Sequence, residues 1–227
     1  MKRNFFLLNV IIITVSLLCS GSLYADKPKV KGYYVNKNGD KMEVLMEIFT
    51  QPFSKKINEA KFQNGFEYYD KKGKSVKVTS KEAEEFGLIY MGEEYVFRYV
   101  PLKPNANVVG VIPEGLFCRL LIDGPCTLLA AKIYKQTAGG YSFDDEFVLY
   151  KNKTDVYLTQ MGLRMIPYST NKLSMQEFFA DCPELTAKMK NKEFKKGDDR
   201  YHRLVTCYNT ACGEAGANQV EEEDLGE

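Results

Sequence analysis

The chain offers few side chains that could carry acid–base or nucleophilic chemistry. His202 is the only histidine, so it is the only imidazole that could activate a serine or cysteine nucleophile. It follows Tyr201 among charged residues of a helix-prone segment, which is typical of a half-exposed surface position. The segment 140–144, with Ser142, lacks the second glycine of a nucleophile elbow. The pattern therefore predicts a surface role for His202.

Three consecutive acids form the other candidate site. Asp144, Asp145 and Glu146 could supply the two carboxylates that flank the bond cleaved by a glycosidase. Their adjacency does not set the separation that this chemistry needs, so we expect solvated loop acids. A small exported hydrolase with a site in the long loops near His202, or near Asp144 and Asp145, is the alternative functional hypothesis.

Metal and cofactor chemistry have little support in the residue types. A single histidine excludes a multi-histidine metal centre. The six cysteines contain no Cys-x-x-Cys pair, which disfavours zinc-ribbon and thioredoxin-type sites. We expect no catalytic residue, no metal site and no cofactor.

Aromatic residues could form a binding surface or fill the core. Tyr95, Phe97 and Tyr99 alternate with Val96, Arg98 and Val100, as the buried face of a strand does. A stacking surface for sugar or peptide is the other interpretation. The sequence contains no Trp, the ring favoured for sugar stacking, so the core interpretation is preferred.

The N-terminus has the layout of an export signal. Lys2 and Arg3 precede an apolar run too short to span a membrane comfortably. We expect a signal peptide over residues 1–25 with cleavage after Ala25, while cuts at Ser20 or Gly21 and an uncleaved anchor stay open. Lipidation at Cys19 is disfavoured because Leu18, a large residue, precedes it. The expected location is the periplasm, the outer membrane or the medium.

Removal of the leader takes Lys2 and Arg3 from 31 bases, which leaves 29 against 30 acids. Such a balance of charges provides no net positive potential that would attract nucleic acid, and we expect no nucleic-acid partner. The segment 213–227 carries acids and no base, which predicts a frayed, disordered tail. With 44% apolar and 27% charged residues, the rest is a globular chain without a further membrane span.

The first two thirds of the mature chain predict β-strands. The pair Asn38 and Gly39 favours a two-residue hairpin turn, which would place Val35 opposite Met42 and Tyr33 opposite Val44. Tyr34 would then lie on the polar face. Further turn signals punctuate short β-prone runs. We expect long loops at 101–115 and 136–146, and a short helix begun by Thr79 and Glu82, which have capping-box spacing.

The last third switches to helical patterns. Ser174 and Glu177 form a capping box, and Leu173 with Phe178 occupies the positions of a hydrophobic staple. A second helix begins near Pro183, and a third carries the apolar stripe of residues 201, 204, 205 and 208.

These patterns predict an α+β fold: an antiparallel β-rich sheet, sandwich or open barrel, followed by a C-terminal cluster of about three short helices. The expected organisation is a β-rich domain over 26–172, a helical subdomain packed on it over 173–212, and the acidic tail over 213–227.

The mature chain has an odd number of cysteines, so one thiol must stay unpaired. A hairpin at residues 123–125 would put Cys118 and Cys126 on opposite faces or roughly 13 Å apart, beyond the about 7 Å that a bridge allows. Both should be buried free thiols. Cys212 continues the apolar stripe of the last helix, so Cys182–Cys212 is the preferred bond, with Cys182–Cys207 as the competing pair.

Two pairs of short motifs, one pair at each end of the mature chain, resemble motifs of a known group of proteins. Gly-Tyr-x-Val and Gly-Asp stand at Gly32–Val35 and Gly39–Asp40, and Asp-Cys-Pro-x-Leu and Tyr-Asn-x-x-Cys stand at Asp181–Leu185 and Tyr208–Cys212. The chain thereby resembles a group of exported proteins of Bacteroidota. The resemblance implies export and the pairing of Cys182 with Cys212, and it implies no activity.

Taken together, the patterns favour an exported, non-enzymatic binding or structural component of the cell envelope. Its expected partner is an envelope protein or a peptide or glycan ligand.

Overall fold

The structure is a computed structural model that describes residues 28–51, 54–102, 115–137, 140–152, 155–159, 174–194, 197 and 199–213. Of segments 133–137 and 140–144 it describes the backbone alone. The predicted leader lies outside the described residues, as do the predicted acidic tail after Gly213 and residues 103–114 of the first predicted long loop.

The strands are β1 (Lys29–Asn36), β2 (Lys41–Glu47), β3 (Gly65–Tyr69), β4 (Ser75–Thr79), β5 (Ala83–Tyr90), β6 (Glu93–Val100), β7 (Leu116–Ile122), β8 (Cys126–Thr137), β9 (Gly140–Lys151) and β10 (Asp155–Leu158). The helices are α2 (Glu59–Phe62), α3 (Met175–Phe178), α4 (Pro183–Lys190) and α5 (Arg200–Ala211).

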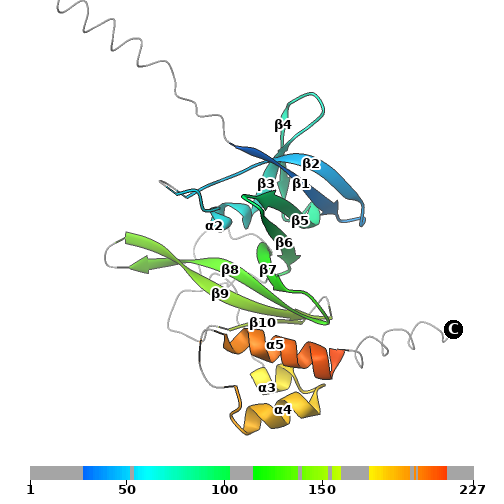
Figure 1. The fold of residues 1–227 in the computed structure, drawn as a ribbon, viewed down its shortest axis with the longest axis vertical. Helices are drawn as coiled ribbons and strands as arrows, with labels where there is room; N and C mark the ends of the chain where they lie inside the picture. Colours follow the sequence, from blue (N-terminus) through cyan, green and yellow to red (C-terminus); the bar gives the residue numbers. More distant parts are fainter. Residues whose placement is uncertain are drawn as a thin grey trace, which may run out of the picture.

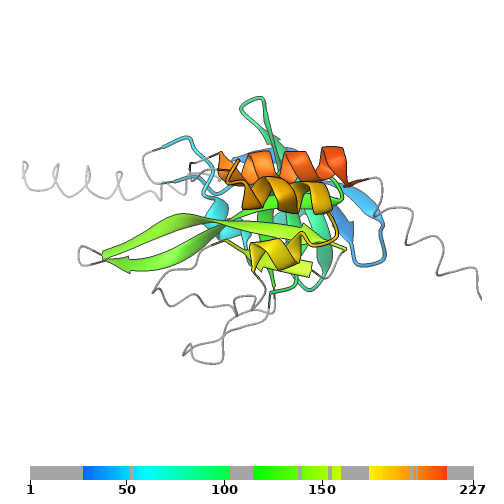
Figure 2. The same cartoon turned by 90° about the horizontal axis from the view of Figure 1, so that it is seen from below.

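The described strands form one open antiparallel sheet of ten strands in the order β10-β9-β8-β7-β6-β5-β1-β2-β3-β4. Helices α3, α4 and α5 lie together beside β8, β9 and β10, at the opposite end of the molecule from β1–β4 (Figure 1). The view from below shows α4 beside α5 (Figure 2), and α5 is the helix that packs against β8. The prediction of an antiparallel β-rich sheet with short helices near the C-terminus is confirmed.

The β1–β2 hairpin exists, but its predicted register is wrong by one residue. Val35 faces Lys41, Tyr34 faces Met42 and Tyr33 faces Glu43. The cause is the side chain of Asn36, whose Oδ1 accepts from the backbone N–H groups of Asn38 and Asp40, each at 2.9 Å. This bonding builds a three-residue loop in which Gly39 takes a φ of 86°. The slip moves Tyr34 into the core and Tyr33 to the opposite face.

An aromatic cluster fills the inner face of the first half of the sheet. The ring of Phe86 on β5 lies 4.5 Å from Phe66 on β3, 4.8 Å from Phe97 on β6 and 4.9 Å from Phe117 on β7, between centroids. Strands β6, β5, β1 and β2 separate β7 from β3 in the sheet, so the sheet curls round this cluster. The backbone N–H of Phe117 also donates to the carbonyl oxygen of Gln63, just after α2, at 2.9 Å. Core filling by the aromatic residues of β6 is confirmed.

Two further local predictions are wrong. Thr79 and Glu82 do form the capping hydrogen bonds, with the Glu82 carboxylate accepting from the Thr79 N–H at 2.8 Å and its hydroxyl at 2.7 Å. They close the turn between β4 and β5, because Ala83 and the residues after it form a strand that pairs with β1 and β6. The predicted loop over 136–146 is instead part of a long hairpin in which Thr137 pairs with Gly140.

The helical prediction near the C-terminus holds in its main features. The Ser174 and Glu177 capping box is present, while Leu173 of the staple lies outside the described residues. Pro183 occupies the first turn of α4, where its missing N–H is harmless. On α5 the residues Leu204, Val205 and Tyr208 are buried against a second core cluster that Leu128, Leu149 and Tyr157 of the sheet share.

The cysteines divide as the favoured pairing predicts. Cys182 and Cys212 are bonded, with Cα atoms 5.8 Å apart. Cys118 and Cys126 are buried free thiols in different core clusters, one on each side of the sheet. Burial raises the pKa of each thiol to about 12, so neither supplies a thiolate nucleophile at neutral pH.

The disulfide joins two residues that are 30 positions apart in the sequence, and it links the start of α4 to the end of α5. We expect the double variant Cys182→Ser/Cys212→Ser to lose about 3–4 kcal/mol of the free energy of unfolding, through the larger entropy of its unfolded chain. Urea unfolding under non-reducing conditions measures this loss. The half-buried Cys207 supplies the control, because Cys207→Ser leaves the bond intact and should cost less than about 1 kcal/mol. Equal losses in both variants would contradict the assigned pairing.

Candidate functional site

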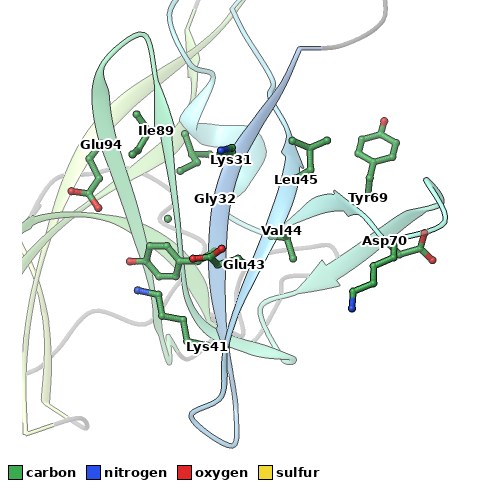
Figure 3. A pocket seen from close by; sticks show the side chains of 14 residues that line it. Lys31, Gly32, Lys41, Glu43, Val44, Leu45, Tyr69, Asp70, Ile89 and Glu94 are labelled. Carbon is green, nitrogen blue, oxygen red and sulfur yellow. The ribbon is translucent and has the colours of Figure 1, made fainter.

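The outward face of the first half of the sheet carries a groove of about 640 Å³. Side chains from β1, β2, β3, β5 and β6 and from the turn after β3 surround it (Figure 3). Its lining residues are Lys31, Gly32, Tyr33, Lys41, Glu43, Val44, Leu45, Tyr69, Asp70, Lys71, Gly87, Leu88, Ile89 and Glu94. We call this surface the outward groove.

The period of two along each strand explains why this face remains open. Phe86 and Leu88 of β5 point into the aromatic core, so Gly87 and Ile89 between them point outward. Gly87 pairs with Tyr33, and a Cβ atom there would lie only 2.4 Å from the Tyr33 ring. The absence of a side chain at Gly87 therefore lets the Tyr33 ring lie down on the sheet and form the floor of the groove.

Two contacts hold the Tyr33 ring in place. Its hydroxyl donates to Oε1 of Glu85 at 2.9 Å, and the Lys41 ammonium lies 3.7 Å from the ring centroid. Burial and the hydrogen bond to Glu85 raise the pKa of Tyr33, so the hydroxyl stays protonated at neutral pH. Arg98 in turn fixes the other oxygen of Glu85 at 2.8 Å. The ring is thus a preorganised aromatic surface rather than a mobile one.

Exposed apolar side chains flank this ring. Ile89 is 61% exposed and Leu45 is 41% exposed, although both stand on strands of a well-packed sheet. Lys31 lies opposite Leu45 on the neighbouring strand. An exposed isoleucine and leucine beside a fixed tyrosine ring give the groove an apolar contact surface of the kind that marks binding sites.

Charges around the groove balance. Its lysines are Lys31, Lys41 and Lys71, and its acids are Glu43, Asp70 and Glu94. The groove therefore offers paired sites of both signs to a ligand, without a net field that would select a polyanion.

A second groove of about 710 Å³ lies where the two halves of the sheet meet. On one side Arg98 makes two hydrogen bonds to the Asp123 carboxylate, at 2.7 and 3.1 Å, and this pairing lowers the pKa of Asp123. On the other side Lys151 and Tyr208 reach into it from β9 and α5. Arg98 and Lys151, two cations of this groove, are each bound by a carboxylate, so we assign it a structural role.

Lys151 is the most deeply buried ion of that junction, with a side chain 7% exposed. Its ammonium lies 2.8 Å from Oδ1 of Asp181, and the Tyr208 hydroxyl donates to Oδ2 of the same carboxylate at 2.6 Å. Burial acts to raise the pKa of Asp181, but the hydrogen bonds from Lys151 and Tyr208 outweigh it, and the pKa falls below its usual value. This trio ties α5 and the segment before α4 to β9.

The sequence candidates for catalysis do not come together. His202 on α5 contacts the ring edge of Phe147, with centroids 6.0 Å apart, and is half-exposed as predicted. Asp145 stands on β9 and pairs with Lys132 across the hairpin, so the expectation of loop acids is wrong. The side chain of Asp144 lies outside the described residues. Glu146 is buried and accepts from the Thr159 hydroxyl at 3.1 Å.

Sequence patterns missed most of the outward groove. Leu45 between Glu43 and Glu47 was the available signal, because it is an apolar residue at an outward position of a strand. Ile89 gave no usable signal, since the capping-box interpretation of Thr79 and Glu82 hid the strand that carries it. The one-residue error in the predicted register places Tyr33 on the inner, apolar face instead of the outward face.

Comparison of the chain with protein families, with curated proteins and with solved structures finds no match. Within the described residues, no group of three or more His, Cys, Asp or Glu side chains is placed to hold a metal ion. None of the helices formed by those residues has the length and apolar character needed to cross a membrane.

The Lys151 and Asp181 pair gives a test of the junction. Asp181→Ala would leave the buried ammonium without its carboxylate, and we expect a loss of about 2–3 kcal/mol in the free energy of unfolding. The loss falls below that of a fully buried pair because the Asp181 side chain is 45% exposed. Glu184→Ala, which removes the solvent-exposed partner of Lys188, is the matched control and should cost less than about 1 kcal/mol. Equal losses would contradict the account.

The same pair predicts a pH dependence. Because the folded pKa of Asp181 lies below the unfolded value of about 3.9, the stability that its charge contributes is fully present above about pH 4. That contribution is lost as the pH falls through the lowered folded pKa. The difference in unfolding free energy between the native chain and Asp181→Ala should therefore shrink below about pH 4, as urea titrations at stepped pH would show. A difference that stays constant to pH 2 would count against the ion pair.

Proposed function

We propose that the chain is an exported, non-enzymatic binding protein of the cell envelope, and that the outward groove takes its ligand. The observation that carries the proposal is the combination of a fixed tyrosine ring with exposed Ile89 and Leu45 on one open sheet face. Burial of those residues against a ligand would remove apolar area from water, at about 25 cal/mol for each Å². The fold gives them no core to pack against, so a ligand is the partner that suits them.

Export is the second element of the proposal. The apolar leader pattern over residues 1–25 and the resemblance to exported proteins of Bacteroidota support it. The bonded pair of Cys182 and Cys212 suits an oxidising compartment, where such bonds persist. Peptides and glycans are the ligand classes that fit an aromatic and aliphatic floor with balanced charges at its rim.

Ile89→Asp tests the groove directly. An aspartate there places a charge in the apolar surface beside the Tyr33 ring, so binding to a glycan array and to displayed random heptapeptides should fall at least about tenfold. Met91→Asp is the matched control, because Met91 is 69% exposed and outside the groove lining. Its positive φ of 54° is one that aspartate adopts readily. Equal binding by both variants, or loss in both, would contradict a site at the outward groove.

A further inference from the structure

We propose that the ligand of the outward groove is an extended peptide segment of a partner protein, which adds to the free edge of β2 as an extra antiparallel strand. This inference rests on the proposed function and specifies its ligand class. It comes from the pairing of β2, which is complete on one side and interrupted on the other.

Strand β2 is paired with β1 from Lys41 to Glu47. Toward β3 it pairs only through Leu45 and Met46, which face Tyr69 and Tyr68. The β3–β4 hairpin turns aside at Asp70, so no strand among the described residues pairs with residues 41–44 of β2 on that side. In Figure 3 Lys41 lies well away from Tyr69 and Asp70, at the other end of the groove.

The hydrogen-bond pattern identifies which backbone groups are free. The N–H of Asn36 donates to the carbonyl of Asp40 at 3.0 Å, so these residues are a hydrogen-bonded pair. Bonded and non-bonded pairs alternate along an antiparallel ladder. Met42 and Val44 therefore bond to β1, whereas the N–H and C=O groups of Lys41 and Glu43 point toward the gap. In the part of the chain that the structure describes, those four groups have no backbone partner.

The surroundings of the gap specify the peptide. A peptide residue opposite Met42 would place its side chain on the inner face, beside half-buried Met42 and Val44 at the margin of the aromatic core. Residues opposite Glu43 and Lys41 would project outward into the groove. Opposite charges across neighbouring strands stabilise the pairing. An antiparallel peptide should therefore read basic, apolar, acidic from its N-terminus.

A second copy of this chain fits the gap less well than a free peptide. Two-fold pairing of two β2 strands about Met42 would set Lys41 against Glu43, but it would also bring Gly39 of the other copy opposite Leu45. Tyr69 already occupies that position. Charged side chains on a free edge also discourage self-pairing. A peptide that ends or bends beside Asp70 avoids this collision.

The experiment begins with selection of displayed random heptapeptides on the purified full chain. Strongly retained peptides should share the basic–apolar–acidic order, and a synthetic peptide of that consensus is then titrated by calorimetry. Glu43→Pro removes a backbone N–H that the fold does not use, at an edge position where proline is tolerated. Its affinity should fall more than about 20-fold, because the added ring also blocks the approach of the peptide backbone. Glu43→Ala keeps the N–H and should lose no more than about fivefold.

A second measurement does not depend on the folding of any variant. N-methylation of the peptide at the residue opposite Glu43 blocks an amide that faces β2, and binding should be lost. N-methylation at the central apolar residue modifies an amide that faces away from β2, and binding should persist.

The outcomes separate this inference from the proposed function. Loss of peptide binding in Ile89→Asp together with equal affinities of the two Glu43 variants would overturn strand addition and leave the groove as the site. Binding of glycans alone, lost in Ile89→Asp, would do the same. Binding that is indifferent to Ile89→Asp would overturn both. A stable dimer of the free chain that dissociates in Glu43→Pro would replace the peptide with a second copy and overturn the inference.

Discussion

The register of the β1–β2 hairpin decides which side of the sheet every side chain of these strands occupies. Asn36 sets that register, because its carboxamide oxygen accepts from two backbone N–H groups of the loop and enforces three loop residues instead of two. Tyr34, Met42 and Met46 then face the aromatic core, and Tyr33, Glu43 and Leu45 face outward. A shift of one residue between the two strands would place Tyr33 on the same face as Met42 and Tyr34 on the same face as Glu43, since side chains alternate along a strand.

The outward groove follows from this register together with the curl of the sheet. Phe66, Phe86 and Phe117 draw the inner faces of distant strands together, so the core of the first half of the sheet forms on one of its two faces. The residues left outside are held by polar contacts, and the Glu85 carboxylate joins Tyr33 in the groove to Arg98 in the neighbouring junction. The Tyr33 ring is therefore held in one position, and the groove is open at the β2 edge.

Patterns in the sequence predicted elements better than they predicted sites. The capping box at Ser174, Pro183 in a first turn and the stripe on α5 are local features, and the helices formed where they indicate. Thr79 and Glu82 show the limit of local signals, because the same hydrogen bonds close a β-turn when the residues that follow form a strand. The hairpin loop depended on one side-chain hydrogen-bond acceptor at Asn36. The groove depended on Gly87 lying opposite Tyr33, a pairing between strands that no local pattern contains.

Amide hydrogen exchange of the free chain, resolved at residues 41–44, measures which backbone groups of β2 bond to β1 and which face the gap. We predict slow exchange at Met42 and Val44, whose N–H groups bond to β1, and fast exchange at Lys41 and Glu43, whose N–H groups face the gap. The reverse pattern, with Lys41 and Glu43 protected and Met42 and Val44 exchanging, would contradict this pairing, because the N–H groups of Lys41 and Glu43 would then bond to β1 instead of facing the gap.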